Sequence, residues 1–171
     1  DSLARGLSRL GIRKEEKIAA LLPPGPEFVS LFFAAAKLGA VIVPLNPELG
    51  GRSLNEILSN AEPVALMTVK AVDDELLRQI ASLRHVIRAG EAGGGLPLAK
   101  VMEAGPADLG IIPVAPTDLL ALMYTSGTTG TPKATMHTHS SLIAPVVASL
   151  KVRELWLRPT SLRTVLGVAK A

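Results

Sequence analysis

The chain has 171 residues, of which 48% are hydrophobic and 19% are charged, and its formal net charge is +3 at pH 7. This length suffices for one domain with a hydrophobic core, and the composition excludes a disordered body. We find no apolar run of membrane-spanning length and no signal peptide, and the absence of cysteine excludes a disulfide framework and a thiolate metal site. We therefore expect a soluble cytoplasmic protein without a transmembrane segment.

The positive charge is concentrated near the end of the chain. Residues 151–171 carry five basic side chains and one acid, whereas residues 1–150 have a net charge of −1. Surfaces that bind nucleic acid combine clustered Lys and Arg with aromatic residues, and this chain has three Phe, one Trp and one Tyr. We therefore expect no nucleic-acid partner. A solvated helix is the favoured interpretation of the basic segment, with contact to phosphates or a membrane surface as the alternative.

Hydrophobic periodicity predicts alternating helices and strands in the first half of the chain. The predicted helices are 3–10, 27–38, 53–61 and 73–83, and the predicted strands are 18–22, 40–43, 64–68 and 85–87. Gly11 and Gly39 are placed to end the first two helices, and Pro44 is expected to close the second strand. Ser53 and Glu56 form a predicted capping box for the third helix.

The second half begins with a predicted flexible loop at residues 90–97, which contains three consecutive glycines. Residues 98–103 predict one or two helical turns, and residues 105–116 a connector rich in Pro and Gly. The apolar run 119–124 predicts a buried strand. The alternation as a whole predicts an α/β fold with a mostly parallel sheet and helices on both faces, and ligands gather at the carboxyl ends of strands in such sheets.

The segment Tyr124-Thr-Ser-Gly-Thr-Thr-Gly-Thr-Pro-Lys133 begins at the last residue of the predicted strand 119–124. Gly127 and Gly130 can adopt positive φ, which lets backbone N–H groups converge into an anion-binding nest. Lys133 adds a mobile positive charge that suits a phosphate. The segment also carries five hydroxyl side chains, Thr125, Ser126, Thr128, Thr129 and Thr131. It predicts a phosphate-binding loop, and on composition alone a tight hairpin turn is the alternative.

This loop differs from a Walker loop, in which the lysine directly follows the second glycine and precedes Ser or Thr. Here Lys133 comes three positions after Gly130 and precedes Ala134. The order Ser-Gly-Thr-Thr-Gly-x-Pro-Lys instead closely resembles the signature loop of the adenylate-forming enzymes, namely acyl-CoA synthetases, luciferases and the adenylation domains of peptide synthetases. Residues 3–46 also resemble the first helices and strands of that family.

The resemblance implies a fold like the first part of the large N-terminal domain of acyl-CoA synthetases. It also implies a function, in which the complete enzyme activates a carboxylic acid with ATP and Mg²⁺ as an acyl-adenylate and passes the acyl group to coenzyme A. The implied phosphate-binding residues are Thr125, Ser126, Gly127, Thr128, Thr129, Gly130 and Lys133. No catalytic residue and no metal ligand can be assigned.

The family's acidic nucleoside-binding motifs and its catalytic C-terminal lysine have no counterpart in this sequence. The favoured interpretation is therefore a fragment of an acid–thiol ligase that is inactive by itself. The alternatives are a nucleotide- or polyphosphate-binding module without catalysis, and a structural scaffold.

The sequence departs from the family pattern at several positions. Ala134 stands where the family usually has glycine, whereas His139 agrees with a common family histidine and His137 is interpreted as a strand-edge residue. The resemblance covers residues 1–145, which predicts an N-terminal portion of an AMP-binding domain followed by a basic tail at 146–171. We also expect uncovered apolar surface on Val41, Ile42 and the strand 119–123, and self-association as its consequence.

Overall fold

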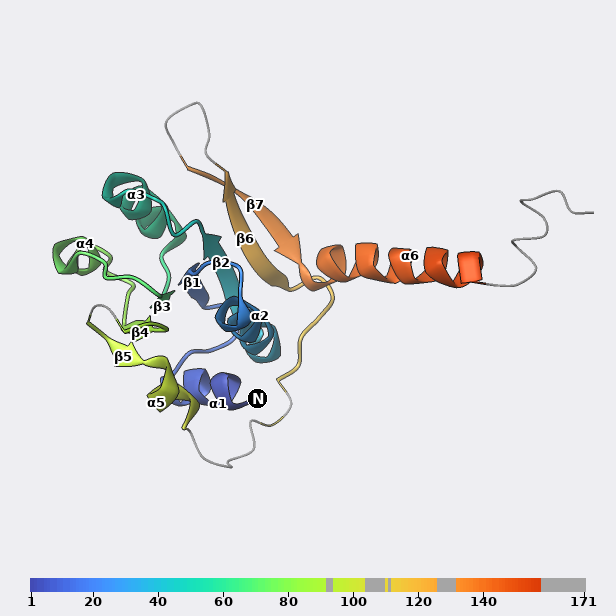
Figure 1. Cartoon of the computed structure of the whole chain (residues 1–171), viewed down its shortest axis with the longest axis horizontal. Helices are drawn as coiled ribbons and strands as arrows, with labels where there is room; N and C mark the ends of the chain where they lie inside the picture. The colour runs from blue at the N-terminus through green and yellow to red at the C-terminus, as the bar shows by residue number, and fades with distance from the viewer. Residues whose placement is uncertain (92–93, 104–109, 111, 126–131, 158–171) are drawn as a thin grey trace, which may run out of the picture.

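A computed structural model describes residues 1–91, 94–103, 110, 112–125 and 132–157, with residues 152–157 as backbone. Helices and strands alternate along most of this chain, as the sequence predicts (Figure 1). The helices are α1 (Ser2–Arg9), α2 (Pro26–Leu38), α3 (Gly51–Ala61), α4 (Asp74–Arg78), α5 (Leu98–Met102) and α6 (His139–Leu157). The strands are β1 (Lys17–Leu21), β2 (Val41–Leu45), β3 (Ala65–Thr68), β4 (His85–Arg88), β5 (Leu96–Pro97), β6 (Leu119–Thr125) and β7 (Lys133–Thr138).

Within the described residues, the strands form one seven-stranded sheet in the order β5-β4-β3-β1-β2-β6-β7. All neighbouring strands are parallel except β6 and β7, which form an antiparallel hairpin at one edge. The central strand β1 pairs on both sides, so that Ala19 lies opposite Val43 of β2 and Leu66 of β3. The predicted α/β fold with a mostly parallel sheet is confirmed.

Alternate side chains of β1 enter two separate cores, because successive residues of a strand point to opposite faces. Ile18 and Ala20 join a core that is covered by α1, α2 and α5. Ala19 and Leu21 join a second core that is covered by α3 and by the segment around α4. Burial of one Leu side chain contributes about 1.5–3 kcal/mol. The predicted helices on both faces are therefore confirmed.

Two predicted element ends are wrong. Pro44 does not close the second strand, because β2 continues to Leu45 and Pro44 lies in register opposite Ala20 of β1. The capping box at Ser53 is also wrong, because α3 begins at Gly51 without a side-chain cap. Ser53 therefore lies within the first turn, and Glu56 accepts a hydrogen bond from Arg52 at 3.2 Å.

The helix predicted at 73–83 is shorter than its pattern suggests. α4 ends at Arg78. At its N-terminus, the Asp73 carboxylate caps the helix by accepting from the N–H of Glu75 at 2.9 Å. The chain then continues in turns, in which the N–H of Ile80 donates to the carbonyl of Leu77 at 3.2 Å. Ile80 is nevertheless buried in the second core, so turns satisfy the same apolar spacing that predicted a helix.

The prediction of a flexible loop at 90–97 is wrong at its end, because Leu96 and Pro97 form the short strand β5 beside β4. The expected exposure of Val41 and Ile42 is also wrong, since they are only 2% and 0% exposed. β2 lies between β1 and β6, and α2 covers the face that Ile42 enters. In the described part of the chain, no helix combines the length and the apolar character needed to cross a membrane.

Gly39 ends α2 in a backbone conformation that only glycine adopts without strain. Its φ is +65°, and an added Cβ would lie 2.9 Å from Cγ of Lys14. Its carbonyl accepts from the N–H of Glu15 at 2.8 Å, which joins the end of α2 to the loop before β1. The sequence-based assignment of Gly39 as the end of the helix is confirmed.

We expect Gly39→Ala to lower the free energy of unfolding by about 1–2 kcal/mol, because it adds left-handed strain and a steric conflict. Gly50→Ala is the matched control, since Gly50 has negative φ and no atom within 4 Å of the added Cβ. Urea unfolding followed by circular dichroism measures both variants. Equal stability of the two variants would contradict this account of Gly39.

Candidate functional site

The candidate phosphate-binding loop is joined to the sheet by the hairpin of β6 and β7. Thr125 is the last residue of β6 and lies opposite Lys133, the first residue of β7. β6 runs parallel to β2, so Thr125 stands at the carboxyl end of a strand in the parallel part of the sheet. This is the edge at which open α/β sheets bind ligands.

The structure describes four residues of the signature segment, Tyr124, Thr125, Pro132 and Lys133. The predicted site residues Ser126, Gly127, Thr128, Thr129 and Gly130 lie outside the described residues, as does Thr131. Thr125 and Lys133 are both exposed. Among the described residues, Lys133 has no ion-pair partner.

Tyr124 connects the end of β6 to helix α3. Its side chain packs against the second core, and its hydroxyl donates to Oδ1 of Asn60 at 2.6 Å. Burial raises the pKa of Tyr124 above its ordinary value, so the hydroxyl stays protonated at neutral pH and remains a donor. Sequence reasoning missed Asn60, because a pair 64 residues apart leaves no local signal.

Ala134 causes no backbone strain at the exit of the loop. It lies in β7 opposite Tyr124, and among the described non-glycine residues only Glu15 and Glu62 have positive φ. The methyl group at a position where the adenylate-forming enzymes usually have glycine is therefore accommodated by an ordinary strand. His137 lies opposite Ala121 on the edge strand β7, which confirms its interpretation as a strand-edge residue.

A second set of contacts holds the other end of the hairpin. Nζ of Lys14 lies 2.7 Å from the Asp118 carboxylate and donates to the carbonyl of Pro113 at 3.0 Å. The same carboxylate accepts from the N–H of Ala115 at 2.8 Å, and the Asp118 carbonyl accepts from the N–H of His139 at 3.1 Å. These contacts join the loop before β1, the connector and the start of α6.

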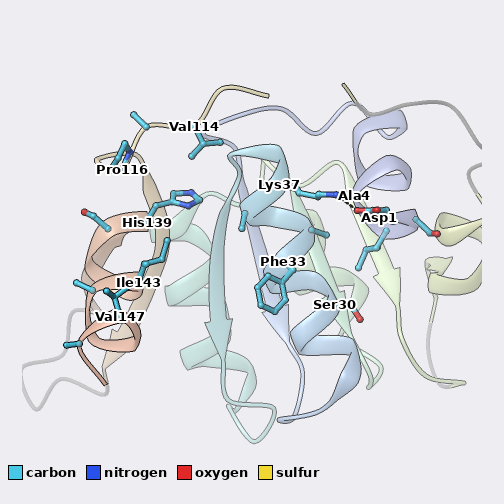
Figure 2. Close-up of a pocket in the computed structure, with 18 of the residues that line it drawn as sticks. Asp1, Ala4, Ser30, Phe33, Lys37, Val114, Pro116, His139, Ile143 and Val147 are labelled. Atoms are coloured by element: carbon cyan, nitrogen blue, oxygen red, sulfur yellow. Dashed lines mark hydrogen bonds and ion pairs between the residues drawn. The ribbon is translucent and has the colours of Figure 1, made fainter. Parts of the chain in front are cut away.

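An apolar groove of about 1130 Å³ separates α2 from α6. Figure 2 shows Phe33 on α2 and Ile143 and Val147 on α6 along its sides, with His139 and Lys37 also at its lining. Phe33 is 63% exposed, Ile143 is 55% and Val147 is 42%. The residues that the structure describes contain no cluster of His, Asp and Glu that could hold a metal ion.

Comparison with known proteins decides the family. A family model described as "AMP-binding enzyme" matches residues 1–169. The chain belongs to this family. It is 37% identical over 138 residues to the long-chain-fatty-acid–CoA ligase FadD13 of Mycobacterium tuberculosis, a match that covers 80% of this chain and 27% of the relative. It is 32% identical over 151 residues to an olefin β-lactone synthetase of Xanthomonas campestris, a match that covers 85% of this chain and 27% of that relative. The chain thus spans little more than a quarter of the length of these relatives.

Solved structures agree with this assignment. The N-terminal domain of FACL13 from Mycobacterium tuberculosis superimposes with a TM-score of 0.68 at 33% identity, covering 83% of this chain and 37% of that one. A long-chain-fatty-acid–CoA ligase from Archaeoglobus fulgidus gives a TM-score of 0.71 at 32% identity, and the match covers 84% of this chain and 29% of that one. The fold therefore matches the N-terminal part of acyl-CoA synthetases, as the sequence resemblance implied.

We expect Asp118→Asn to lower the unfolding temperature at neutral pH. The hydrogen bond from Lys14 and then the one from Ala115 hold the pKa of Asp118 below its ordinary value of 3.8. Because this pKa is lower in the folded chain, the pair stabilises the fold above the unfolded pKa and loses its effect as pH falls through the folded pKa. Thermal unfolding between about pH 2 and pH 7 measures the difference from the wild type.

Lys14→Met provides the matched variant, since it removes the other partner of the same pair. The double variant is expected to lose less stability than the sum of the two single variants, because both changes abolish the same Lys14–Asp118 pair. Additive losses, or a difference that does not shrink in acid, would contradict the role of this ion pair.

Proposed function

We propose that this chain supplies the phosphate-binding loop of an ATP-dependent acid–thiol ligase of the acyl-CoA synthetase type. The complete enzyme activates a carboxylic acid as an acyl-adenylate. The observation that carries the proposal is the exposed Thr125–Lys133 pair, which closes a hydroxyl-rich loop at the ligand-binding edge of the sheet. Family membership and the ligase relatives support the same reaction class.

In the proposed first half-reaction, a carboxylate oxygen attacks the α-phosphorus of ATP and pyrophosphate leaves. The attack requires that the leaving charge be neutralised and held in line. The hydroxyls of Ser126, Thr128 and Thr129 and the backbone N–H groups of 127–130 are the proposed donors to the β- and γ-phosphate oxygens. Lys133 is the proposed counter-charge.

The donor set suits polyphosphate, because it combines hydroxyls, glycines and one lysine without a nearby acid in the segment 124–133. Mg²⁺ would neutralise the phosphates, and we assign it no protein ligand. In the second half-reaction, the thiol of coenzyme A takes the acyl group and AMP leaves. We place the reaction in the cytoplasm, where ATP and coenzyme A are available.

A second candidate function is a nucleotide- or polyphosphate-binding module without catalysis. It is supported by the exposed Thr125 and Lys133 at the carboxyl end of β6, which suit an anion whether or not a reaction follows. ATP–pyrophosphate exchange separates the two functions. The division into an AMP-binding portion at 1–145 and a basic tail at 146–171 also remains a proposal, and α6 continues across it with Pro145 inside the helix.

We expect Lys133→Ala to weaken binding of Mg·ATP and of Mg·pyrophosphate by about tenfold or more, because it removes a charge-assisted contact to phosphate. Isothermal titration calorimetry of the 171-residue chain measures both ligands. Lys100→Ala is the control, since Lys100 is an exposed lysine on α5 away from the loop. Unchanged affinity in folded Lys133→Ala, or no binding by the folded wild type, would overturn the proposal for this chain.

We also propose that the chain self-associates through the groove between α2 and α6, because this surface is apolar and exposed. In sedimentation velocity experiments, the sedimentation coefficient is expected to rise with protein concentration. Ile143→Glu places a charge in the groove and is expected to restore a monomer, whereas Met136→Glu, on β7 outside the groove, is not. A concentration-independent monomer that binds no apolar dye would contradict this proposal.

A further inference from the structure

The hairpin that carries the candidate phosphate loop forms one edge of the sheet. β6 runs parallel to β2, with Ala121 opposite Ile42, and pairs with β7 from Ala121 to Thr125. Pro44 near the end of β2 has no backbone N–H to donate to a neighbouring strand.

A β-bulge interrupts the pairing of the hairpin. Leu119 lies opposite Thr138 and Ala121 lies opposite His137, so two steps along β6 match one step along β7. An extra residue of this kind bends the strand and increases its twist. Side-chain contacts of the Thr125 end with elements outside the sheet therefore help to hold the direction of the hairpin.

Helix α3 offers a fixed point beside this end. Leu54, Leu58 and Ala61 are buried in the second core, so the helix is held by packing along its length. Asn60 lies in the last turn of the same helix, on its exposed side. In Figure 1, α3 and the loop-side ends of β6 and β7 lie on the same side of the molecule.

We propose that the hydrogen bond from the Tyr124 hydroxyl to Asn60 Oδ1 positions Thr125 and Lys133, the two residues that flank the candidate phosphate-binding loop. Tyr124 is the residue before Thr125, and its 2.6 Å bond joins the loop-side end of β6 to α3. Both residues are positioning residues, because they act through the strand and do not contact the phosphates themselves. The expected effect on ligand binding rests on the proposed function, namely that the segment between Thr125 and Lys133 binds polyphosphate.

The first test measures the position of the hairpin without any ligand. Tyr124→Phe keeps the ring that packs on the second core and removes only the hydroxyl. Amide hydrogen exchange, followed by NMR, is expected to speed up about threefold to tenfold for residues 123–125 and 133–135, because one hydrogen bond restrains their local opening. Amides of the central strand β1 are expected to keep their protection.

Variants of Asn60 test the partner. Asn60→Ala is expected to reproduce the effect of Tyr124→Phe, and the double variant to add nothing further. Asn60→Asp keeps an acceptor oxygen and is expected to restore protection. Asn55→Ala is the matched control on the same helix, since Asn55 donates to Gln79 at the end of α4 and not to the hairpin. It is expected to leave the exchange of 123–125 unchanged.

The second test is calorimetric titration of the same variants with Mg·pyrophosphate. Tyr124→Phe and Asn60→Ala are expected to raise Kd about threefold to tenfold while the unfolding temperature stays close to that of the wild type. A purely structural role would change the unfolding temperature and leave Kd unchanged, and that result would overturn the positioning role.

The two tests separate the inference from the proposed function. Unchanged exchange in Tyr124→Phe overturns the positioning role whatever the ligand does. A second outcome is that Tyr124→Phe speeds exchange at 123–125 while the wild-type chain binds no pyrophosphate. That outcome supports the Tyr124–Asn60 bond as a restraint on the hairpin and overturns phosphate binding. Faster exchange together with weaker binding supports both.

Discussion

The arrangement of this chain depends on the burial of β1 from all sides. Its residues Ile18 to Leu21 are fully buried, since β2 and β3 pair with both edges and helices cover both faces. A strand in this position must be apolar on both faces, which explains why it has no polar alternation. Ala19 and Ala20 are small, so the helices on each face can approach the sheet closely. The parallel neighbours then share one carboxyl edge, and the order of the sheet brings Thr125 to that edge.

The hairpin of β6 and β7 differs from the rest of the sheet because it is antiparallel and lies at the edge. Two side-chain contacts hold this edge hairpin, one at each of its ends. Lys14 and Asp118 fix the end where the connector enters and α6 begins, and Tyr124 and Asn60 fix the end where the loop begins. An anion-binding loop needs donors that are already oriented, because ordering them on binding reduces affinity. Under the proposed function, a hairpin held at both ends would supply part of that orientation.

Local sequence signals predicted the parts of the fold that local physics decides. Gly39 ends α2 with φ of +65°, and the pattern of apolar residues located most helices and strands. The same reasoning failed where the local pattern had two solutions. Ser53 and Glu56 have capping-box spacing, but the helix starts earlier at Gly51, and the apolar spacing around Ile80 is satisfied by turns. The partners Asn60 and Lys14 could not be predicted, because each meets a residue 64 or more positions away.

At the candidate site, binding of polyphosphate and reaction with a carboxylate have different structural requirements. The proposed binding of polyphosphate uses the residue types of the segment 124–133, because a lysine and oriented hydroxyls suit phosphate oxygens. Transfer to a carboxylate requires in addition that the acid lie in line with the leaving oxygen, and effective concentration falls steeply when that geometry is not imposed. The described residues hold the hairpin from two sides but leave the groove between α2 and α6 open. Binding of phosphate and positioning of the acid are therefore separable properties, and the proposal for this chain concerns the first.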